Sequence, residues 1–194
     1  MAHIMLPTSL ADKIVTRKVG MNWPAQQNRS GWAAGASKII LLGGGERSYF
    51  QMALRPLVTE TEFREARAFF YALEGIANTF DLPVLPSPQG GTNKTVNAAT
   101  GAGAKTLTLN NTTGLLAGMP VSITQPTGHR RFVVITLVSG VTINIRPAIT
   151  EALSIGAAVE VINPVSRVRL SDPRFSYDDS MGIGGFSLDV EEAI

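Results

Sequence analysis

The chain has 194 residues and a formal net charge of +2 at pH 7, with 44% hydrophobic and 16% charged residues. This length allows one domain or two small ones around a real hydrophobic core, and the composition excludes coiled coils, collagen-like chains and long charged tails. The absence of cysteine excludes a disulfide scaffold, thiol catalysis and cysteine-ligated metal sites, and the small net charge argues against strong polyanion binding.

The N-terminal part is predicted to be built from strands. Three runs are β-like: Ile14–Val19, Lys38–Leu42 and Ser48–Leu57. The sequence Gly43-Gly44-Gly45-Glu46 between the last two runs is typical of a hairpin loop. Trp23 and Trp32 flank a segment rich in Gln, Asn, Ser and Gly, and packing in a core or interface explains them better than a ligand platform.

Residues 60–77 are predicted to form one amphipathic helix. The sequence Thr59-Glu60-Thr61-Glu62 is a capping box, in which the Thr59 hydroxyl accepts the backbone N–H of Glu62 while the Glu62 side chain reaches back. Apolar residues follow at intervals of three and four: Phe63, Ala66, Phe70, Leu73 and Ala77. One face of this helix is therefore expected to pack on the outer sheet.

A change in composition divides the chain. The stretch from Pro83 to Pro164 holds 7 of the 32 charged residues and one of the 13 aromatic residues, Phe132. Proline and glycine residues mark both of its ends. Residues 89–163 are therefore predicted to be an inserted all-β domain, and residues 1–88 and 164–194 to form one discontinuous outer domain.

Short alternating runs are predicted as strands on both sides of this division. The insert has five: Lys105–Leu109, Val121–Thr124, Phe132–Val138, Val141–Ile145 and Ala157–Ile162. Ser139-Gly140 marks the best hairpin candidate. Strands of the outer domain follow: Thr79–Leu82, Val165–Leu170, Phe175–Tyr177 and Phe186–Val190. The predicted fold is mainly β with one amphipathic helix, an outer β-sandwich carrying an inserted small β-barrel or sandwich domain.

Two candidate active-site motifs are weak. Gly101–Thr106 is similar to a phosphate loop, but Ala104 stands where a glycine must precede the lysine, so a flexible lead into a strand is favoured. The two histidines, His3 and His129, lie at opposite ends of the predicted layout and form no His-x-x-x-His motif. Metal binding and Ser-His-Asp hydrolysis are therefore both disfavoured.

Charged pairs give equally little catalytic signal. Asp178-Asp179 and Glu191-Glu192 are adjacent carboxylates, which point to opposite faces of a strand and do not form a glycosidase pair, so a solvated loop and a polar C-terminus are favoured. The clusters His129-Arg130-Arg131 and Arg167/Arg169 could meet phosphate or partner carboxylates, although scattered solvated charge is the preferred interpretation. No catalytic, cofactor or metal residue is assigned.

A membrane span is not expected. The longest uncharged stretch, Thr106–Gly128, contains two asparagines, two prolines and a glutamine, whereas a bilayer span needs about 20 predominantly apolar residues. The N-terminus has no basic region ahead of an apolar stretch, so no secretion signal is expected either.

Several sequence segments together resemble those of the distal tail proteins of siphophages and gene transfer agents. Phe50–Leu57 precedes the Glu-rich helix, and Ala68–Gly75 is similar to the family's aromatic pair followed by Leu-x-Gly. The resemblance extends over most of residues 48–170 through further similar segments: Thr79–Pro83, Pro88–Gly90, Gly101–Leu109, Gly114–Gly118, Ile143–Pro147 and Gly156–Val161.

The resemblance implies a structural virion protein with no catalysis and no cofactor. Such proteins form a homo-oligomeric ring, commonly a hexamer, that joins the tail tube to hub and tape-measure proteins and leaves a channel through which DNA passes without sequence-specific binding. The implied location is the virion tail, assembled in the bacterial host cytoplasm. An N-terminal arm, from Met1 to about Lys13 with apolar Ile4, Leu6 and Leu10, fits contacts with neighbouring subunits.

Two alternatives stay open. The chain is another minor tail or tail-tube protein, or it carries a carbohydrate-binding module on the insert, in which Phe132 would be the sugar-stacking residue. Because sugar stacking usually needs several aromatic faces and the insert has one, a structural role for the insert is favoured.

Overall fold

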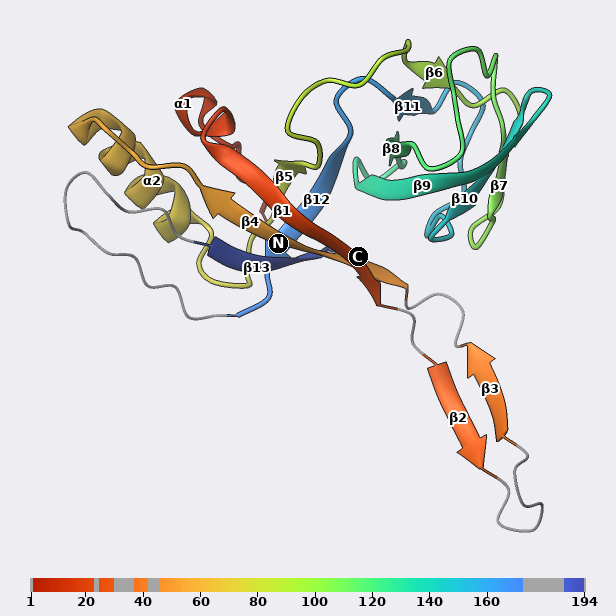
Figure 1. Cartoon of the computed structure of the whole chain (residues 1–194), viewed down its shortest axis with the longest axis horizontal. Coiled ribbons are helices and arrows are strands. Elements are labelled where there is room, and N and C mark those ends of the chain that lie inside the picture. Colours follow the sequence, from red (N-terminus) through yellow and green to blue (C-terminus); the bar gives the residue numbers. More distant parts are fainter. Residues whose placement is uncertain (1, 23–24, 30–36, 42–45, 173–186, 194) are drawn as a thin grey trace.

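The computed structural model describes residues 2–22, 25–29, 37–41, 46–172 and 187–193. The fold is mainly β, with a nearly closed barrel-like sheet, a curled half-barrel sheet and two helices (Figure 1). This confirms the predicted fold class. Neither helix in the described ranges has the length and apolar content that crossing a membrane requires.

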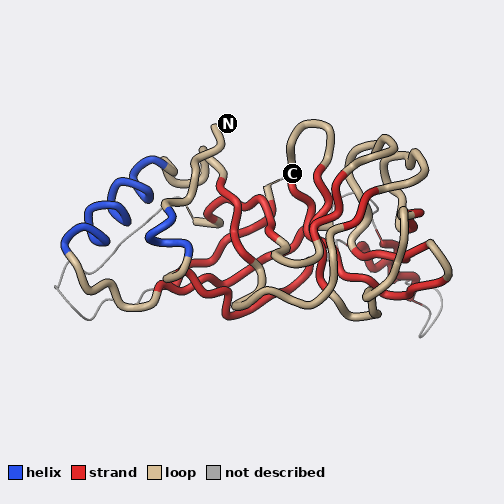
Figure 2. The backbone as a smooth tube through the Cα atoms, turned by 90° about the horizontal axis from the view of Figure 1, so that it is seen from above, coloured by secondary structure: helices blue, strands red, loops and turns tan. Residues whose placement is uncertain are grey.

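The half-barrel is a five-stranded antiparallel sheet. Its strands, in spatial order, are β1 (Ile14–Asn22), β4 (Arg47–Leu54), β13 (Ser187–Glu192), β12 (Val165–Leu170) and β5 (Phe80–Pro83). Strand β13, near the C-terminus, lies between β4 and β12, so the two ends of the chain contribute to one sheet. Two helices accompany this sheet: α1 (Thr8–Ala11) and α2 (Glu60–Ala72). Figure 2 shows them at the end of the molecule that lies away from the barrel.

Alternation of side chains along the strands gives the half-barrel a concave core face. Phe50 and Met52 of β4 and Val190 of β13 are buried on this face, where they pack with the apolar side of α2. The Phe69 ring of α2 lies edge-on to Phe80 of β5, with ring centroids 5.3 Å apart. The helix therefore covers the concave face, as its apolar spacing predicted.

The start of α2 is as predicted and its end is not. The capping box forms, because Glu62 N donates to Thr59 Oγ1 at 3.2 Å and Thr59 N donates to Glu62 Oε2 at 3.1 Å. The helix ends at Ala72 and not at residue 77. Glu74 and Gly75 take positive φ angles of 49° and 64°, and Asn78 Nδ2 donates to the Ala72 carbonyl at 3.0 Å, which closes the helix early.

The N-terminal residues fold onto their own core. Leu10 is fully buried, and Ile4 and Leu6 pack against the same cluster. Ile4 N also donates to the Thr79 carbonyl at 2.7 Å, next to β5. The prediction that these residues form an arm for neighbouring subunits is therefore wrong for Leu10, which its own subunit buries, whereas Ile4 and Leu6 are partly buried and contacts with neighbours stay a prediction for them.

A two-stranded ribbon of β2 (Ala25–Arg29) and β3 (Ser37–Leu41) extends away from both sheets (Figure 1). The strands β2 and β3 pair with each other, whereas β4 pairs with β1 and β13. The predicted hairpin between β3 and β4 is therefore wrong, since β1 and β4 pair around the ribbon. Several predicted features fall outside the described residues, among them Gly43–Gly45, the tryptophans Trp23 and Trp32, and the strand Phe175–Tyr177.

The second sheet has six strands and forms the barrel. They are, in spatial order, β6 (Lys94–Thr95), β11 (Ala158–Glu160), β8 (Pro120–Thr124), β9 (Arg130–Ser139), β10 (Thr142–Arg146) and β7 (Thr106–Thr108). A bridge between Val96 and Leu109 brings the two edges together. All five strands predicted for the insert are present, whereas β6 was not predicted. Of the two predicted forms, the insert takes that of a barrel.

The predicted β9–β10 hairpin is confirmed with a shift of one residue. Ser139 pairs with Thr142, so the two turn residues are Gly140 and Val141, and Gly140 has a φ of 58°. The exact boundaries of the inserted domain stay a prediction, although strands within residues 94–160 and strands outside this range belong to separate sheets.

Candidate functional site

Strand β9 is shared by the two hydrophobic cores. Val133 and Ile135 are buried inside the barrel. Phe132, which directly precedes Val133, is buried in the half-barrel core. The Phe132 ring lies edge-on to Phe50 with centroids 5.5 Å apart. Because successive side chains of a strand point to opposite faces, β9 supplies both cores and joins them.

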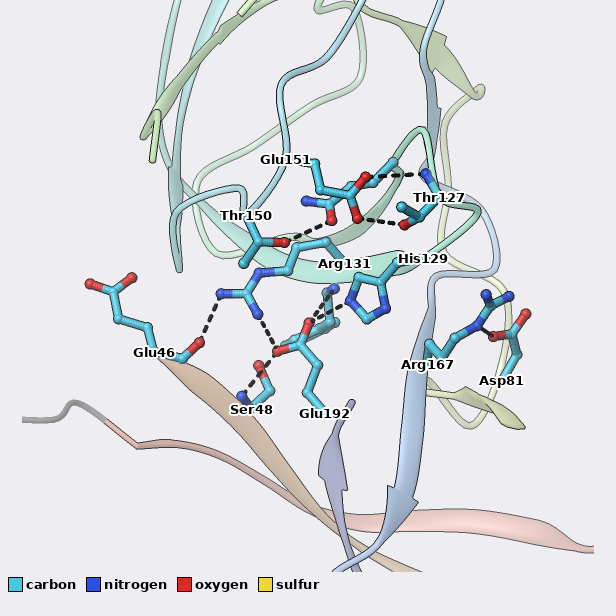
Figure 3. Close-up of polar contacts among 12 residues, drawn as sticks. Glu46, Ser48, Asp81, Thr127, His129, Arg131, Thr150, Glu151, Arg167 and Glu192 are labelled. Atoms are coloured by element: carbon cyan, nitrogen blue, oxygen red, sulfur yellow. Dashed lines mark hydrogen bonds and ion pairs between the residues drawn. The ribbon is translucent and has the colours of Figure 1, made fainter. Parts of the chain in front are cut away.

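A cluster of polar residues, four of them buried and His129 partly buried, lies where β9 meets the half-barrel, and we call it the junction: Glu46, Ser48, His129, Arg131 and Glu192. Figure 3 shows the Arg131 guanidinium between Glu46 and Glu192. Arg131 has 1% of its surface exposed. Its Nη1 lies 2.8 Å from Glu192 Oε2, its Nη2 donates to the Glu46 carbonyl at 2.8 Å, and its Nε donates to the Ala148 carbonyl at 3.1 Å. All three guanidinium nitrogens therefore contact an oxygen.

Glu192, at the end of β13, receives donors from two other strands, β4 and β9. Besides Arg131, its Oε2 accepts Ser48 N at 3.1 Å and its Oε1 accepts Phe132 N at 3.3 Å. His129 Nε2 lies 3.7 Å from the same Oε1. This one carboxylate, which is fully buried, therefore connects β4 and β13 of the half-barrel with β9 of the barrel.

Glu46 makes a second connection between the sheets. Its Oε2 accepts Ala148 N at 3.0 Å, and its Oε1 lies 3.6 Å from Lys105 Nζ. Glu46 directly precedes β4, whereas Lys105 and Ala148 belong to the barrel segment. Two ion pairs thus cross the junction, each with its carboxylate on the half-barrel side and its cation on the barrel side, so each buried charge has a partner of opposite sign.

The junction contains the residue types of a hydrolytic triad without the properties of an active site. Ser48 and Glu192 are fully buried, and both Glu192 oxygens accept backbone N–H groups. A substrate carbonyl needs access to the serine, and the histidine of a triad must accept the serine proton, whereas Ser48 Oγ has no hydrogen-bond partner among the described residues and His129 Nε2 lies 3.7 Å from Glu192 Oε1. The contacts of these residues therefore join the barrel to the half-barrel. Within the described ranges, no three His, Asp or Glu side chains are grouped so as to hold a metal ion.

A second polar group lies beside the junction, around Asp81 of β5. Arg167 Nε donates to its Oδ1 at 3.1 Å, while Arg130 Nε and His3 Nε2 lie 3.5 and 3.9 Å from its Oδ2. The predicted basic cluster His129-Arg130-Arg131 is thus divided. Arg130 faces Asp81 at the surface, whereas the interpretation of Arg131 as solvated charge is wrong, because the junction buries it.

The two adjacent glutamates also separate. Glu191 and Glu192 lie on opposite faces of β13, as predicted from strand geometry, and Glu191 pairs with Arg169 at 2.6 Å. The prediction of a polar, solvated C-terminus is wrong for Glu192, which the junction buries. Asp178 and Asp179 fall outside the described residues.

The structure also places the remaining candidates. Gly101–Lys105 is a non-helical lead into β7, as favoured over a phosphate loop. Phe132 is buried in the half-barrel core, so it is not available for stacking on a sugar, and the carbohydrate-binding alternative loses the one aromatic residue on which it rested.

Sequence reasoning missed the junction, although one signal for it exists. Leu188, Val190 and Glu192 alternate on β13, which places a glutamate at an inward position of a strand. Such a residue needs a buried cation, and Arg131 is likewise a charged residue within a strongly apolar strand, at the second position of β9. The choice of this partner over the other arginines depends on long-range packing.

The comparisons with known proteins assign no family to the chain. No protein-family model matches the chain, and no curated protein matches its sequence.

Proposed function

We propose that the chain is a structural subunit of a virion tail, a distal tail protein whose copies form a homo-oligomeric ring, hexameric in the form we favour, between the tail tube and the hub. The observation that carries this proposal is the ribbon of β2 and β3, which pairs with no third strand among the described residues and extends away from both sheets (Figure 1). An isolated two-stranded ribbon is marginally stable in water, so it calls for a partner surface. A neighbouring copy in a ring supplies such a surface.

The junction supports a structural role in a second way. Its ionisable groups, Arg131, Glu192 and Glu46, are used in contacts that hold the barrel on the half-barrel. A subunit that joins tube and hub must keep its two parts in a constant orientation while DNA passes through the ring. The proposal therefore includes tail tube, hub and tape-measure proteins as partners, and the virion tail as the location.

The proposal is tested by imaging purified full-length protein alone and on tail tubes by electron microscopy, with light scattering for mass. We expect closed rings, one at the tube end of each tail. A strictly monomeric species in assembled tails would contradict the proposal. Many stacked rings per tail would favour a tail-tube protein instead.

A matched variant tests the ribbon. Replacing residues 23–45 by Asn-Gly keeps Glu46 and the Asn22–Arg47 pair of β1 and β4, and gives these strands a short connection. We expect a folded chain that no longer forms rings and whose far-ultraviolet circular dichroism loses the contribution of β2 and β3 alone. Normal ring formation by this variant would remove the ribbon as support for the proposal.

A further inference from the structure

The convex face of the half-barrel, opposite to the buried core face, carries a stripe of charged residues of both signs. We call it the arginine stripe, and its residues come from β4, β13, β12, β5 and the start of β9: Arg47, Glu191, Arg169, Arg167, Asp81 and Arg130. Arg169 and Glu191 are direct neighbours across β12 and β13, as are Arg167 and Asp81 across β12 and β5. Figure 3 shows the second of these pairs.

Each carboxylate of the stripe lies between two arginines. Glu191 Oε1 is 2.6 Å from Arg169 Nη2 and 3.6 Å from Arg47 Nη1, and Asp81 is 3.1 Å from Arg167 and 3.5 Å from Arg130. Four arginines and two carboxylates leave the stripe with a net charge of +2. The next acidic residue on this face, Asp189, accepts a hydrogen bond from Gln51 at 3.4 Å.

An exposed aromatic residue adjoins the stripe. Tyr49 lies on the same face of β4 as Arg47, its register partner on β13 is Glu191, and 53% of its surface is exposed. Its ring lies against Gly20 of β1, where a Cβ atom would overlap it. Tyrosine and arginine are the residue types that most often dominate the binding energy of protein interfaces.

The opposite side of the same sheet carries the complementary charge. Residues 60–75, which form α2 and the turn after it, contain four glutamates and two arginines, a net charge of −2. Lys13, whose Nζ lies 3.2 Å from Glu62 Oε1, reduces the net charge of this surface to −1. Two apolar side chains beside these charges are largely exposed, Val58 at 76% and Tyr71 at 69%. This surface therefore combines acidic groups with apolar area, as the stripe combines arginines with Tyr49.

We propose that the arginine stripe of one copy binds the α2 surface of a second copy, head to tail. This inference rests on the proposed function, because a ring requires two different surfaces that complement each other on successive subunits. The 13 residues of α2 measure about 20 Å along the helix axis, and the four strands from β4 to β5 span about 14 Å, so the two surfaces have similar lengths. A nucleic acid fits less well, since the stripe presents two carboxylates to its phosphates.

Two charge-reversal variants of the full chain test the proposal. The stripe variant carries Arg47→Glu and Arg130→Glu, which keep the Arg167–Asp81 and Arg169–Glu191 pairs. The helix variant carries Glu60→Lys and Glu74→Lys at two exposed positions. A control variant, Leu116→Glu with Ile155→Glu, adds charge at exposed barrel positions away from both surfaces. Self-association is measured by sedimentation up to millimolar concentration, with circular dichroism as a check on folding.

We expect the wild type and the control to associate, and each reversal variant to have a dissociation constant at least tenfold higher, because like charges then face each other. An equal mixture of the two variants restores every opposite-charge contact, so association is expected to return, and high salt is expected to weaken it. The proposal is overturned if the wild type does not associate, if the variants associate like wild type, or if the mixture does not recover. Rings seen on tails despite such a result would leave the proposed function standing without this interface.

Discussion

The two sheets bury cores of different composition. The barrel core is formed by valine, leucine and isoleucine, whereas five phenylalanines are buried in the half-barrel core: Phe50, Phe69, Phe70, Phe80 and Phe132. A nearly closed barrel has a narrow interior that branched aliphatic side chains fill. A half-barrel is open, so large rings from α2 and β9 must cover it. The barrel therefore supplies its own core, while the half-barrel depends on a residue of the barrel.

The largest expected effect comes from breaking the charged contact between the two cores. Replacing Arg131 by Met leaves Glu192 buried without its cation, and losing one partner of a buried ion pair costs about 3–5 kcal/mol. We expect the free energy of unfolding, measured in urea, to fall by this amount. A change below about 1 kcal/mol would show that the junction contributes little to stability.

The double variant Arg131→Met with Glu192→Leu sharpens this result. Apolar residues in place of a complete buried pair are often neutral or stabilising. We therefore expect the double variant to be more stable than Arg131→Met alone, although Ser48 N and Phe132 N lose their acceptor. A double variant as unstable as the sum of its single changes would mean that the two residues act independently.

A similar or slightly smaller effect on stability is expected from removing Phe132, the residue of the barrel sheet that packs in the half-barrel core. Phe132→Ala should cost about 3–5 kcal/mol, and the loss should appear in the half-barrel, because the ring packs on Phe50. Amide hydrogen exchange should accelerate in β4 and β12 before it does in β8 and β10. The matched change Ile135→Ala, on the barrel side of the same strand, should show the reverse order. Equal acceleration in both sheets would make the two cores one cooperative unit.

This asymmetry marks the limit of what the sequence allows one to predict. The low aromatic content of residues 83–164 indicated a segment of distinct composition, and the alternation of leucine and threonine in Lys105–Leu109 indicated its strands. Phe132 belongs to that segment and packs outside the barrel, because it occupies the face of β9 opposite to Val133. Alternation shows that two faces exist, but which partner covers the second face depends on the arrangement of whole sheets.

The ends of elements and the pairing of distant strands were the other errors. The capping box fixed the start of α2 through contacts within four residues, whereas its end depends on Asn78, which reaches back to Ala72. The assignment of β3 and β4 to one hairpin followed from their nearness in sequence, but β4 pairs with β1 and β13. Similarly, the ion pair of Arg131 and Glu192 joins residues 61 positions apart, which local patterns do not reveal.

A moderate effect is expected from weakening the helix that covers the half-barrel. Thr59→Ala removes the hydroxyl that accepts Glu62 N, and loss of such a cap costs about 1 kcal/mol. Because α2 packs on the half-barrel core, exchange should accelerate there while the barrel amides keep their protection. Thr59→Ser keeps the hydroxyl and should stay close to wild type in urea unfolding. A Thr59→Ser variant as unstable as Thr59→Ala would point to lost packing of the methyl group instead.

The same cap gives the half-barrel a dependence on pH. Hydrogen bonds from the backbone N–H groups of Val58 and Thr59, with a further contribution from Lys13, lower the pKa of Glu62 below its usual value of 4.5. A carboxylate with a lowered pKa in the folded state stabilises above its unfolded pKa, and this stabilisation is lost as the pH falls through the folded pKa. Wild type should therefore lose stability below about pH 4.5 relative to Glu62→Gln, measured as the difference between their unfolding midpoints. A difference that stays constant with pH would show that Glu62 keeps its ordinary pKa.

The smallest effect on stability is expected on the convex face, which belongs to neither core. An alanine at position 20 would overlap the Tyr49 ring, but this ring is half exposed and can turn away from the sheet. Alanine also gains about 0.5–1 kcal/mol over glycine within a strand, which offsets the lost contact. We expect Gly20→Ala to change the free energy of unfolding by less than about 1 kcal/mol and to leave exchange in both sheets unaltered.

If Tyr49 contributes to binding a second copy, the same variant should weaken self-association while Tyr49→Phe, which keeps the ring, should not. If Gly20→Ala instead destabilises the half-barrel, residues of the convex face contribute to the stability of this sheet in addition to its hydrophobic core.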